Sequence, residues 1–371
     1  MSNILLISPE PWGANFVSKH HYALELVKRG NIVFYLNPPS KGLGKKVFVQ
    51  QLNDCSNLKI VDYTPIFRGL NKLPAGLSSF LMKLDITRIL KVLNVDLDIV
   101  WSFDPFRFQK LNLFLSKFKI YHSVDVHHTT KEYLIAKNAD VIFSTAHKIL
   151  NKFSEIKLPK YFVNHGLASH FIDNKSLIKY SLVGDQLVKV GYVGNLNYKY
   201  LDKERLYKII SENLNCGFYF IGPRYSNNLS NAEINKEFFN QLEVLPNVYF
   251  LGQIPSKELP HYLCLFDMFL MCYKGDENIA SMANPHKLLE YFSTGKIVLS
   301  HYIDEYARYK DLLVMADNNE NLPILFSKVV TSLDYYNSLD LQHKRKAFAY
   351  DNTYAKQLDR IESIILKYIK L

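Results

Sequence analysis

Lys287 and Glu290 are the residues best suited to bind a nucleotide, because they lie three positions apart near the start of a predicted helix. The N-terminus of a helix presents free backbone N–H groups and a partial positive charge, which together favour a phosphate. Lys287 adds a full charge in the first turn, and Glu290 follows on nearly the same face. A carboxylate there can accept hydrogen bonds from both hydroxyls of a ribose. The pair therefore predicts a nucleoside diphosphate site, and an ordinary surface Lys–Glu pair is the alternative.

The segment around this pair, NPHKLLEYFSTGKIVLS, predicts a helix followed at once by a buried strand. Asn284 is a typical N-cap residue, and Pro285 fits the first helical turn, where its missing N–H is not needed. Gly295 ends the predicted helix, and the apolar run Ile297–Leu299 forms the strand.

This segment resembles the C-terminal nucleotide-sugar motif of glycosyltransferases of the GT-B superfold. It is similar to the group that contains glycosyltransferase family 4 (group 1) and its relatives in capsule and teichuronic-acid biosynthesis. The resemblance implies that Glu290 binds the nucleotide ribose and that Lys287 and the helix start lie near the diphosphate. Met282 stands where many retaining members carry a second glutamate, so inversion and retention both stay open.

The resemblance implies an α/β enzyme with two Rossmann-like domains, parallel sheets and a cleft between the domains. It would transfer a sugar from a nucleotide-diphosphate donor to a hydroxyl acceptor in surface polysaccharide or glycolipid biosynthesis, without a metal or other cofactor. Two alternatives are a nucleotide-sugar epimerase of the same superfold and a basic protein that binds polyanions or membrane surfaces. The donor-binding residues implied in this way are Gly194, Asn195, Lys199, Arg224, Asn284, Pro285, Lys287, Leu288 and Glu290.

Two loops in the second half of the chain support the donor site. In GYVGNLNYKYLD, Gly194 would let the backbone approach a phosphate, Asn195 lies in the same turn, and Lys199 could reach the phosphate charge. Arg224 ends the next predicted strand and could contact a phosphate through two parallel N–H donors. The alternatives are an ordinary strand-to-helix turn and a solvent-facing arginine.

The densest polar cluster of the first half follows a predicted strand, in IYHSVDVHHTTKEY. Asp125, His127 and His128 could supply a base, a contact to a sugar hydroxyl, or both. Inversion needs a base on the acceptor hydroxyl, for which Asp125 is the candidate, whereas His127 would contact the sugar in a retaining enzyme. The alternative is that Asp125 caps a helix beginning near Thr130 and that the histidines are exposed.

The loop SPEPWGANF after the first predicted strand resembles the N-terminal acceptor-side loop of GT-B enzymes. Gly13 would permit close backbone approach, and Trp12 could stack on a sugar ring. The alternative is a plain turn with Trp12 packed inward.

Composition narrows the functional classes. The chain has 371 residues, a net charge of +10 and four cysteines without metal-type or redox-type spacing, which argues against a disulfide framework or zinc site. Asp96 and Asp98 precede their strand, at the wrong end of a sheet for a catalytic metal. The lysines are scattered rather than grouped in a basic block, so we expect no nucleic-acid partner. Without a signal peptide or spanning segment, we expect a cytoplasmic protein with possible contact to the anionic inner face of the membrane.

Short apolar runs typical of buried strands alternate with helical patterns along most of the chain. Two such sets predict two Rossmann-like domains whose parallel sheets are covered on both faces. We predict an acceptor-side domain over 1–172, a polar linker over 173–186, and a nucleotide-sugar domain over 187–351. The last segment, 352–371, is predicted to be a helix that crosses back to the first domain.

Overall fold

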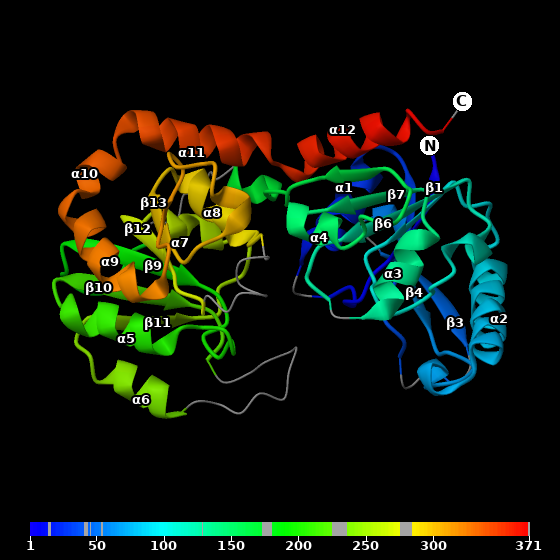
Figure 1. Cartoon of the computed structure of the whole chain (residues 1–371), viewed down its shortest axis with the longest axis horizontal. Helices are drawn as coiled ribbons and strands as arrows, with labels where there is room; N and C mark the ends of the chain where they lie inside the picture. Colours follow the sequence, from blue (N-terminus) through cyan, green and yellow to red (C-terminus); the bar gives the residue numbers. More distant parts are fainter. Residues whose placement is uncertain are drawn as a thin grey trace. The chain divides into compact units, whose positions relative to one another are not determined.

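The computed structural model describes residues 1–13, 16–40, 44, 46–52, 55–127, 129–172, 180–224, 236–274 and 284–369. Backbone contacts divide the chain into two compact units, shown in Figure 1. The first comprises Met1–His165 and Tyr354–Leu371, and the second comprises Gly166–Thr353. The predicted boundaries at 172 and 351 lie a few residues from these limits. Residues 173–179 of the predicted linker lie outside the described residues.

An eight-stranded sheet forms the centre of the first unit. Its strands pair in parallel, except that β3 at the edge runs antiparallel to β4. The inner strands β1 (NILLI) and β2 (IVFYL) are almost wholly buried, as expected for a parallel sheet covered on both faces. In spatial order the strands are β3 (Val47–Leu52), β4 (Cys55–Tyr63), β2 (Ile32–Leu36), β1 (Asn3–Ile7), β5 (Ile99–Ser102), β6 (Phe118–Ser123), β7 (Val141–Ser144) and β8 (Lys160–Phe162).

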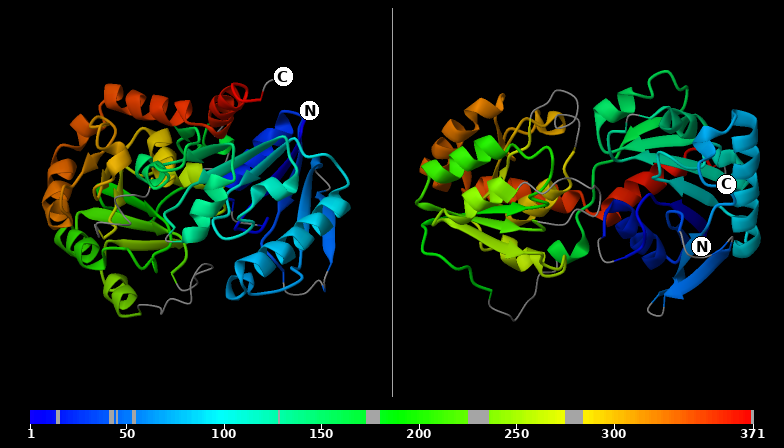
Figure 2. Two further views of the ribbon diagram at one scale, coloured as in Figure 1. Left: turned by 45° about the vertical axis from the view of Figure 1, so that its right-hand side comes forward. Right: turned by 90° about the horizontal axis from the view of Figure 1, so that it is seen from below.

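The C-terminal helix of the chain belongs to the first unit, where it packs on the first helix. The Arg29 guanidinium, just after α1, pairs with Asp359 at 2.7 Å and Glu362 at 2.5 Å on α12. Figure 2 shows α2 along the outer edge of this unit. The helices of the unit are α1 (Ser18–Lys28), α2 (Ala75–Leu93), α3 (Thr130–Lys137), α4 (His147–Asn151) and α12 (Tyr354–Ile365), with a short 3-10 turn, η1, at Leu70–Lys72.

A six-stranded parallel sheet forms the centre of the second unit. In spatial order its strands are β11 (Val248–Gly252), β10 (Cys216–Ile221), β9 (Val188–Val193), β12 (Met268–Met271), β13 (Ile297–Ser300) and β14 (Val314–Met315). Its helices are α5 (Lys203–Glu212), α6 (Lys236–Glu243), α7 (Leu259–Leu263), α8 (Lys287–Thr294), α9 (Leu322–Thr331), α10 (Leu333–Tyr336) and α11 (Leu339–Asp351).

The predicted α/β class with two Rossmann-like domains is confirmed. In each sheet the strand order reverses once, between β1 and β5 in the first unit and between β9 and β12 in the second. Ligands of such sheets bind outside the carboxyl ends of the strands at this reversal. The fold therefore directs attention to the loops that follow these strands.

Candidate functional site

Tyr291 connects α8 to the strand reversal of the second sheet. Among the described residues, strand β9 pairs with β12 only at Val190 and Gly191, so in that part of the chain the end of β9 has no ladder partner on that side. The Val193 N–H instead donates to the Tyr291 hydroxyl at 2.9 Å, and that hydroxyl lies 3.5 Å from the Val193 carbonyl oxygen. The tyrosine therefore fixes α8 beside the loop that begins at residue 194.

Lys287 and Gly194, predicted from separate motifs, lie together at this edge of the sheet. A methyl group in place of a Gly194 hydrogen would lie 2.7 Å from the Lys287 Nζ. A methyl on Gly222, after the neighbouring strand β10, would lie 2.1 Å from the Gly194 carbonyl oxygen. Any side chain at either glycine would displace its neighbours. The glycines therefore bring two loops and an ammonium group to one point, an arrangement that suits an anion.

Glu290 lies one turn further along α8, and solvent reaches part of its side chain. Burial raises the pKa of this carboxyl from 4.5 to about 7, although the Lys287 charge opposes the rise. Among the described residues, none donates a hydrogen bond to the carboxylate. A ligand with two adjacent hydroxyls would supply the donors that this carboxylate needs.

The first turn of α8 differs from the prediction. The helix begins at Lys287 with His286 as its N-cap, so Asn284 is not the N-cap. The Leu288 N–H donates to the Pro285 carbonyl at 3.1 Å, an i-to-i+3 bond that tightens the chain into a 3-10 turn before the α-helix. Asn284, the residue before this turn, has a buried side chain, and Leu288 is fully buried. The Leu288 side chain therefore packs in the interior, and its place in the donor site stays a prediction.

Asn195 and Lys199 have local roles in the structure. The Asn195 Oδ1 accepts from the Asn197 N–H at 2.8 Å, which shapes the turn after β9. Lys199 is exposed, and its Nζ lies 4.5 Å from the centre of the Tyr200 ring. Within the described part of the chain, no contact joins Lys199 to Gly194.

Arg224 is engaged on the surface of the second unit. Its guanidinium pairs with Glu243 at 2.5 Å and lies 4.3 Å from the centre of the Phe250 ring. In this conformation these contacts, rather than a phosphate, hold the Arg224 guanidinium. The guanidinium is not simply solvent-facing, and its contact with a phosphate stays a prediction.

Asp125 follows β6 with its side chain exposed. The cap of α3 is Thr129, whose hydroxyl accepts from the Lys131 N–H at 3.3 Å, so the alternative that Asp125 caps this helix is wrong. Among the described residues, no hydrogen bond or ion pair involves the Asp125 carboxylate. A carboxylate in this state remains available to accept a proton.

His127 lies in the same loop and is partly exposed. Its ring contacts Phe106 edge-on at 5.4 Å, and its carbonyl accepts from the Lys152 Nζ at 2.7 Å. His128 lies outside the described residues. The loop is thus tied to the first unit through backbone and ring contacts, while the imidazole edge still reaches solvent.

Trp12 packs against its own unit. Its backbone N–H donates to the Asn37 Oδ1 at 2.7 Å, and Gly13 next to it is exposed. The half-buried indole packs among rings of its own unit, as the alternative expects, and its stacking on a sugar stays a prediction. The aromatic rings around the indole, at centroid distances of 5.0–5.3 Å, belong to Phe16, His20 and Tyr35.

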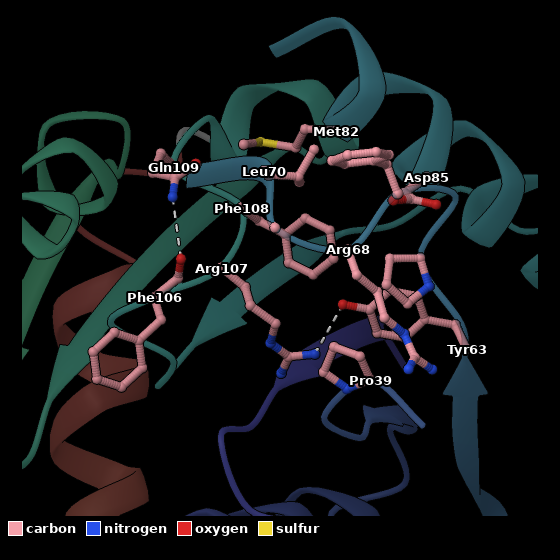
Figure 3. A pocket seen from close by; sticks show the side chains of 13 residues that line it. Pro39, Tyr63, Arg68, Leu70, Met82, Asp85, Phe106, Arg107, Phe108 and Gln109 are labelled. Atoms are coloured by element: carbon pink, nitrogen blue, oxygen red, sulfur yellow. Dashed lines mark hydrogen bonds between the residues drawn. The ribbon is translucent and has the colours of Figure 1, made fainter. Parts of the chain in front are cut away.

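A cavity of about 340 Å³ opens at the carboxyl edge of the first sheet (Figure 3). Arg107 stands in its wall and joins the ends of four strands. The guanidinium donates to the Ser8 carbonyl at 2.5 Å, the Asn37 carbonyl at 2.9 Å and the Tyr63 hydroxyl at 3.2 Å, and it pairs with Asp104. The rest of the lining is mainly apolar and includes Pro39, Pro65, Phe67, Leu70, Met82, Phe106 and Phe108.

One curated protein matches part of the sequence, and no family model matches it. A stretch of 118 residues is 30% identical to the putative teichuronic acid biosynthesis glycosyltransferase TuaH of Bacillus subtilis (strain 168). The stretch covers 32% of this chain and only 28% of that protein.

Solved structures match nearly the whole chain. They include WaaG, a glycosyltransferase involved in lipopolysaccharide biosynthesis, at a TM-score of 0.63 and 13% identity over 98% of this chain and 99% of that one. Anabaena HepE in complex with UDP matches at 0.66 and 12% identity over 98% and 99% of the two chains. A trehalose-6-phosphate structure from E. coli with bound UDP-2-fluoro glucose matches at 0.69 and 10% identity over 98% of each. The chain has the GT-B fold.

Several residues of this GT-B chain lie at the carboxyl edge of the second sheet but were not predicted. His301 follows β13 and is buried, and desolvation lowers the pKa of its imidazole to about 4. Its ring lies 5.2 Å from that of Tyr273, which follows β12. The Tyr192 hydroxyl would lie 3.3 Å from a methyl group on Gly194. The only sequence signal for these residues is their position directly at strand ends.

Glu132 is a second unpredicted group, buried beneath the Asp125 loop of the GT-B first unit. It accepts from the Tyr121 hydroxyl at 2.9 Å, the Ser123 hydroxyl at 2.6 Å and the Lys152 ammonium at 2.7 Å. With these donors around it, the carboxylate is a structural anchor for α3.

Proposed function

We propose that this chain is a glycosyltransferase that moves a sugar from a nucleotide-diphosphate donor to a hydroxyl acceptor in surface polysaccharide or glycolipid biosynthesis. The observation that carries the proposal is the placement of the Lys287 ammonium over Gly194, with Glu290 one turn along α8. These groups match the two polar parts of a nucleoside diphosphate, the phosphates and the ribose diol. The apolar interior around α8 supplies the rigid support that such a site needs.

In this proposal the diphosphate lies against Gly194, the start of α8 and the Lys287 ammonium. The same positive charges that bind the donor stabilise the departing diphosphate as negative charge develops on it. Glu290 accepts hydrogen bonds from the ribose hydroxyls and thereby fixes the orientation of the nucleotide. We propose that these interactions need no metal ion.

We assign the acceptor side to the first unit. In an inverting reaction, the Asp125 carboxylate would take the proton of the acceptor hydroxyl while that oxygen attacks the anomeric carbon and the diphosphate leaves. In a retaining reaction, His127 would contact the donor sugar instead. The cavity beside Arg107 is our candidate for the acceptor group, in preference to the Trp12 loop.

The partial match to TuaH supports sugar transfer over an epimerase, since an epimerase of the same superfold would share the fold. Two of the similar structures contain UDP or a UDP-sugar, so uridine nucleotides are the first donors to test. We propose action in the cytoplasm, at the inner face of the cell membrane, on a glycan or lipid-linked acceptor.

Thermal shift of the full chain against UDP, GDP, ADP and CMP tests the nucleotide site directly. A ligand at about 100 times its dissociation constant should stabilise the protein by roughly 2.7 kcal/mol. No shift with any of these nucleotides would refute the proposal. Turnover of a nucleotide sugar without an acceptor, with formation of an epimer, would favour the epimerase instead.

A further inference from the structure

Helix α2 of the first unit is apolar on its outer face as well as on its core face. On the outer face, Leu77, Phe80 and Leu84 follow the i, i+3, i+7 spacing that places residues on one side of a helix, and they are 48%, 56% and 36% exposed. A surface helix ordinarily turns polar residues outward, so these three side chains need an explanation. The core-facing residues of the same helix are Met82, Ile86, Ile89 and Leu93.

The loop before α2 also carries exposed apolar and basic side chains. Phe67 is 43% exposed, and η1 (Leu70–Lys72) contacts α2. Figure 1 and the right-hand view of Figure 2 show α2 at the outer edge of its unit. We call this surface the α2 face. Its apolar members are Phe67, Leu77, Phe80 and Leu84, and its basic members are Arg68, Lys72, Lys83 and Lys91.

The charge of the α2 face has one sign. Between residues 64 and 95 the sequence contains a single acidic residue, Asp85. That carboxylate is buried, pairs with Arg88 at 3.0 Å and accepts the Ile66 N–H at 3.0 Å. It does not neutralise the exposed basic members of the face. The surface therefore combines exposed large apolar side chains with positive charge.

We propose that the α2 face binds an anionic lipid bilayer. Leucine and phenylalanine side chains would enter the boundary between headgroups and acyl chains, while the flanking lysines and the arginine would contact anionic headgroups. The long lysine stems suit this arrangement, because they can bury methylenes and still place the ammonium at the headgroup level. The helix would lie along the membrane surface. Among the described residues, no helix is long and apolar enough to cross a membrane.

A second copy of the chain is a poorer occupant of this face. A two-fold dimer would place the same surface on both partners, so the basic members would face one another across the contact. A bilayer with anionic lipids instead satisfies the charge and the apolar side chains at once.

The α2 face also adjoins the cavity beside Arg107. Phe67, Arg68 and Leu70 line that cavity, and Met82 and Asp85 line it from α2. A bilayer on the α2 face would place the cavity near the headgroup level. If the proposed glycosyl transfer is correct, this arrangement would admit an acceptor that remains attached to a membrane lipid. The membrane contact itself does not depend on the transferase activity.

Co-sedimentation of the full chain with vesicles tests the membrane contact without measuring activity. The test variant carries Leu77→Ser, Phe80→Ser and Leu84→Ser. The matched control carries Leu214→Ser, Val244→Ser and Ile324→Ser, three apolar residues of the second unit that are 54%, 78% and 71% exposed. Circular dichroism melting establishes that both variants are folded.

We expect the wild type and the control to bind phosphatidylcholine vesicles that contain phosphatidylglycerol, with weaker binding at high salt. The test variant should lose at least about tenfold in partition coefficient, because three large side chains leave the interface. A second variant, Lys72→Gln with Lys83→Gln, should lose roughly tenfold on anionic vesicles and little on pure phosphatidylcholine.

Equal vesicle binding by the test variant and the control would overturn the proposal, as would a wild type that binds no anionic vesicle at low salt. So would a wild-type dimer that the test variant converts to monomer without any vesicle binding, since the face would then join two copies. Failure of nucleotide binding would leave this result untouched and would count against the proposed function alone.

Discussion

Glu290→Gln should stabilise the ligand-free second unit while weakening nucleotide binding. Burial raises the pKa of this carboxyl from 4.5 to about 7. Between these values the folded state binds more protons than the unfolded state, so the free energy of unfolding falls as the pH rises from about 4.5 to about 7. Above this window the ionised carboxylate carries its full penalty, and glutamine removes it.

The size of the penalty follows from the shift of the pKa. A change from 4.5 to about 7 gives (7 − 4.5) × 1.36, or about 3 kcal/mol. Solvent reaches part of the side chain and reduces this figure, so we expect the variant to gain about 1–3 kcal/mol above the window and nothing below it. Glu212→Gln is the matched control, because Glu212 is 56% exposed and lies 4.0 Å from Lys208. Its effect should stay within about 0.5 kcal/mol.

The two units require separate readouts of stability. Both tryptophans, Trp12 and Trp101, belong to the first unit, so their fluorescence reports that unit alone. Amide hydrogen exchange of peptides from β9 and β13 reports the second unit. The Glu290→Gln gain should be seen in the exchange of these peptides and not in the tryptophan signal.

The same substitution should weaken nucleotide binding, which is opposite in sign to its effect on the stability of the ligand-free protein. Loss of hydrogen bonds to a charged group should cost about 1.5–3 kcal/mol of affinity. Calorimetry with UDP-glucose, whose diphosphate keeps its charge across the window, should show wild-type affinity rising as the pH passes about 7 and a flat, weaker response in the variant. Unchanged affinity together with unchanged exchange would refute the assignment of Glu290 and the reasoning from its burial.

Three further substitutions test the remaining parts of the site. By calorimetry, Lys287→Ala should weaken the binding of UDP by about 1.5–3 kcal/mol and the binding of uridine hardly at all. Lys199→Ala is the charge-matched control. Equal losses of affinity for both ligands would contradict the diphosphate contact. Asp125→Asn should lower turnover by roughly 10²–10⁴ without changing donor affinity, and a product of retained anomeric configuration by NMR would contradict its role as base. Tyr291→Phe leaves the Val193 N–H without its partner, so it should destabilise the second unit by about 1–3 kcal/mol, measured by hydrogen exchange, and weaken UDP binding. Unchanged exchange would show that the hydroxyl is dispensable.

The sequence predicted the parallel strands and the second half of α8 because both rest on local signals. Strand β13 is three apolar residues followed by Ser300, with every side chain buried. Gly295 ends α8 with φ at 82°, a conformation that favours glycine. The edge strand β3 was not predicted, because its exposed residues show no alternation and only its pairing with β4 defines it. Local pattern thus specifies buried elements better than edge elements.

How well the sequence placed a candidate side chain depends on whether the residues it contacts are near it in the chain. Lys287 and Glu290 belong to one helical turn, and the motif placed them correctly on α8. Arg224 follows a strand as the phosphate prediction required, but Glu243, far away in the chain, pairs with it. Nothing in the strand-end position reveals such competing partners, since they depend on how the surrounding loops and helices pack.

The geometry of the proposed donor site is also held by residues that no motif contains. The Arg345 guanidinium on α11 is buried and donates to the Gly295 carbonyl at 3.0 Å and to the Leu312 carbonyl at 2.9 Å. It therefore satisfies a carbonyl at the end of α8 while Tyr291 fixes the middle of the helix. Desolvation lowers the pKa of Arg345 to about 10, so the cation persists at neutral pH. A helix held at both points can present Lys287 to Gly194 before a ligand arrives, which reduces the ordering that binding must supply.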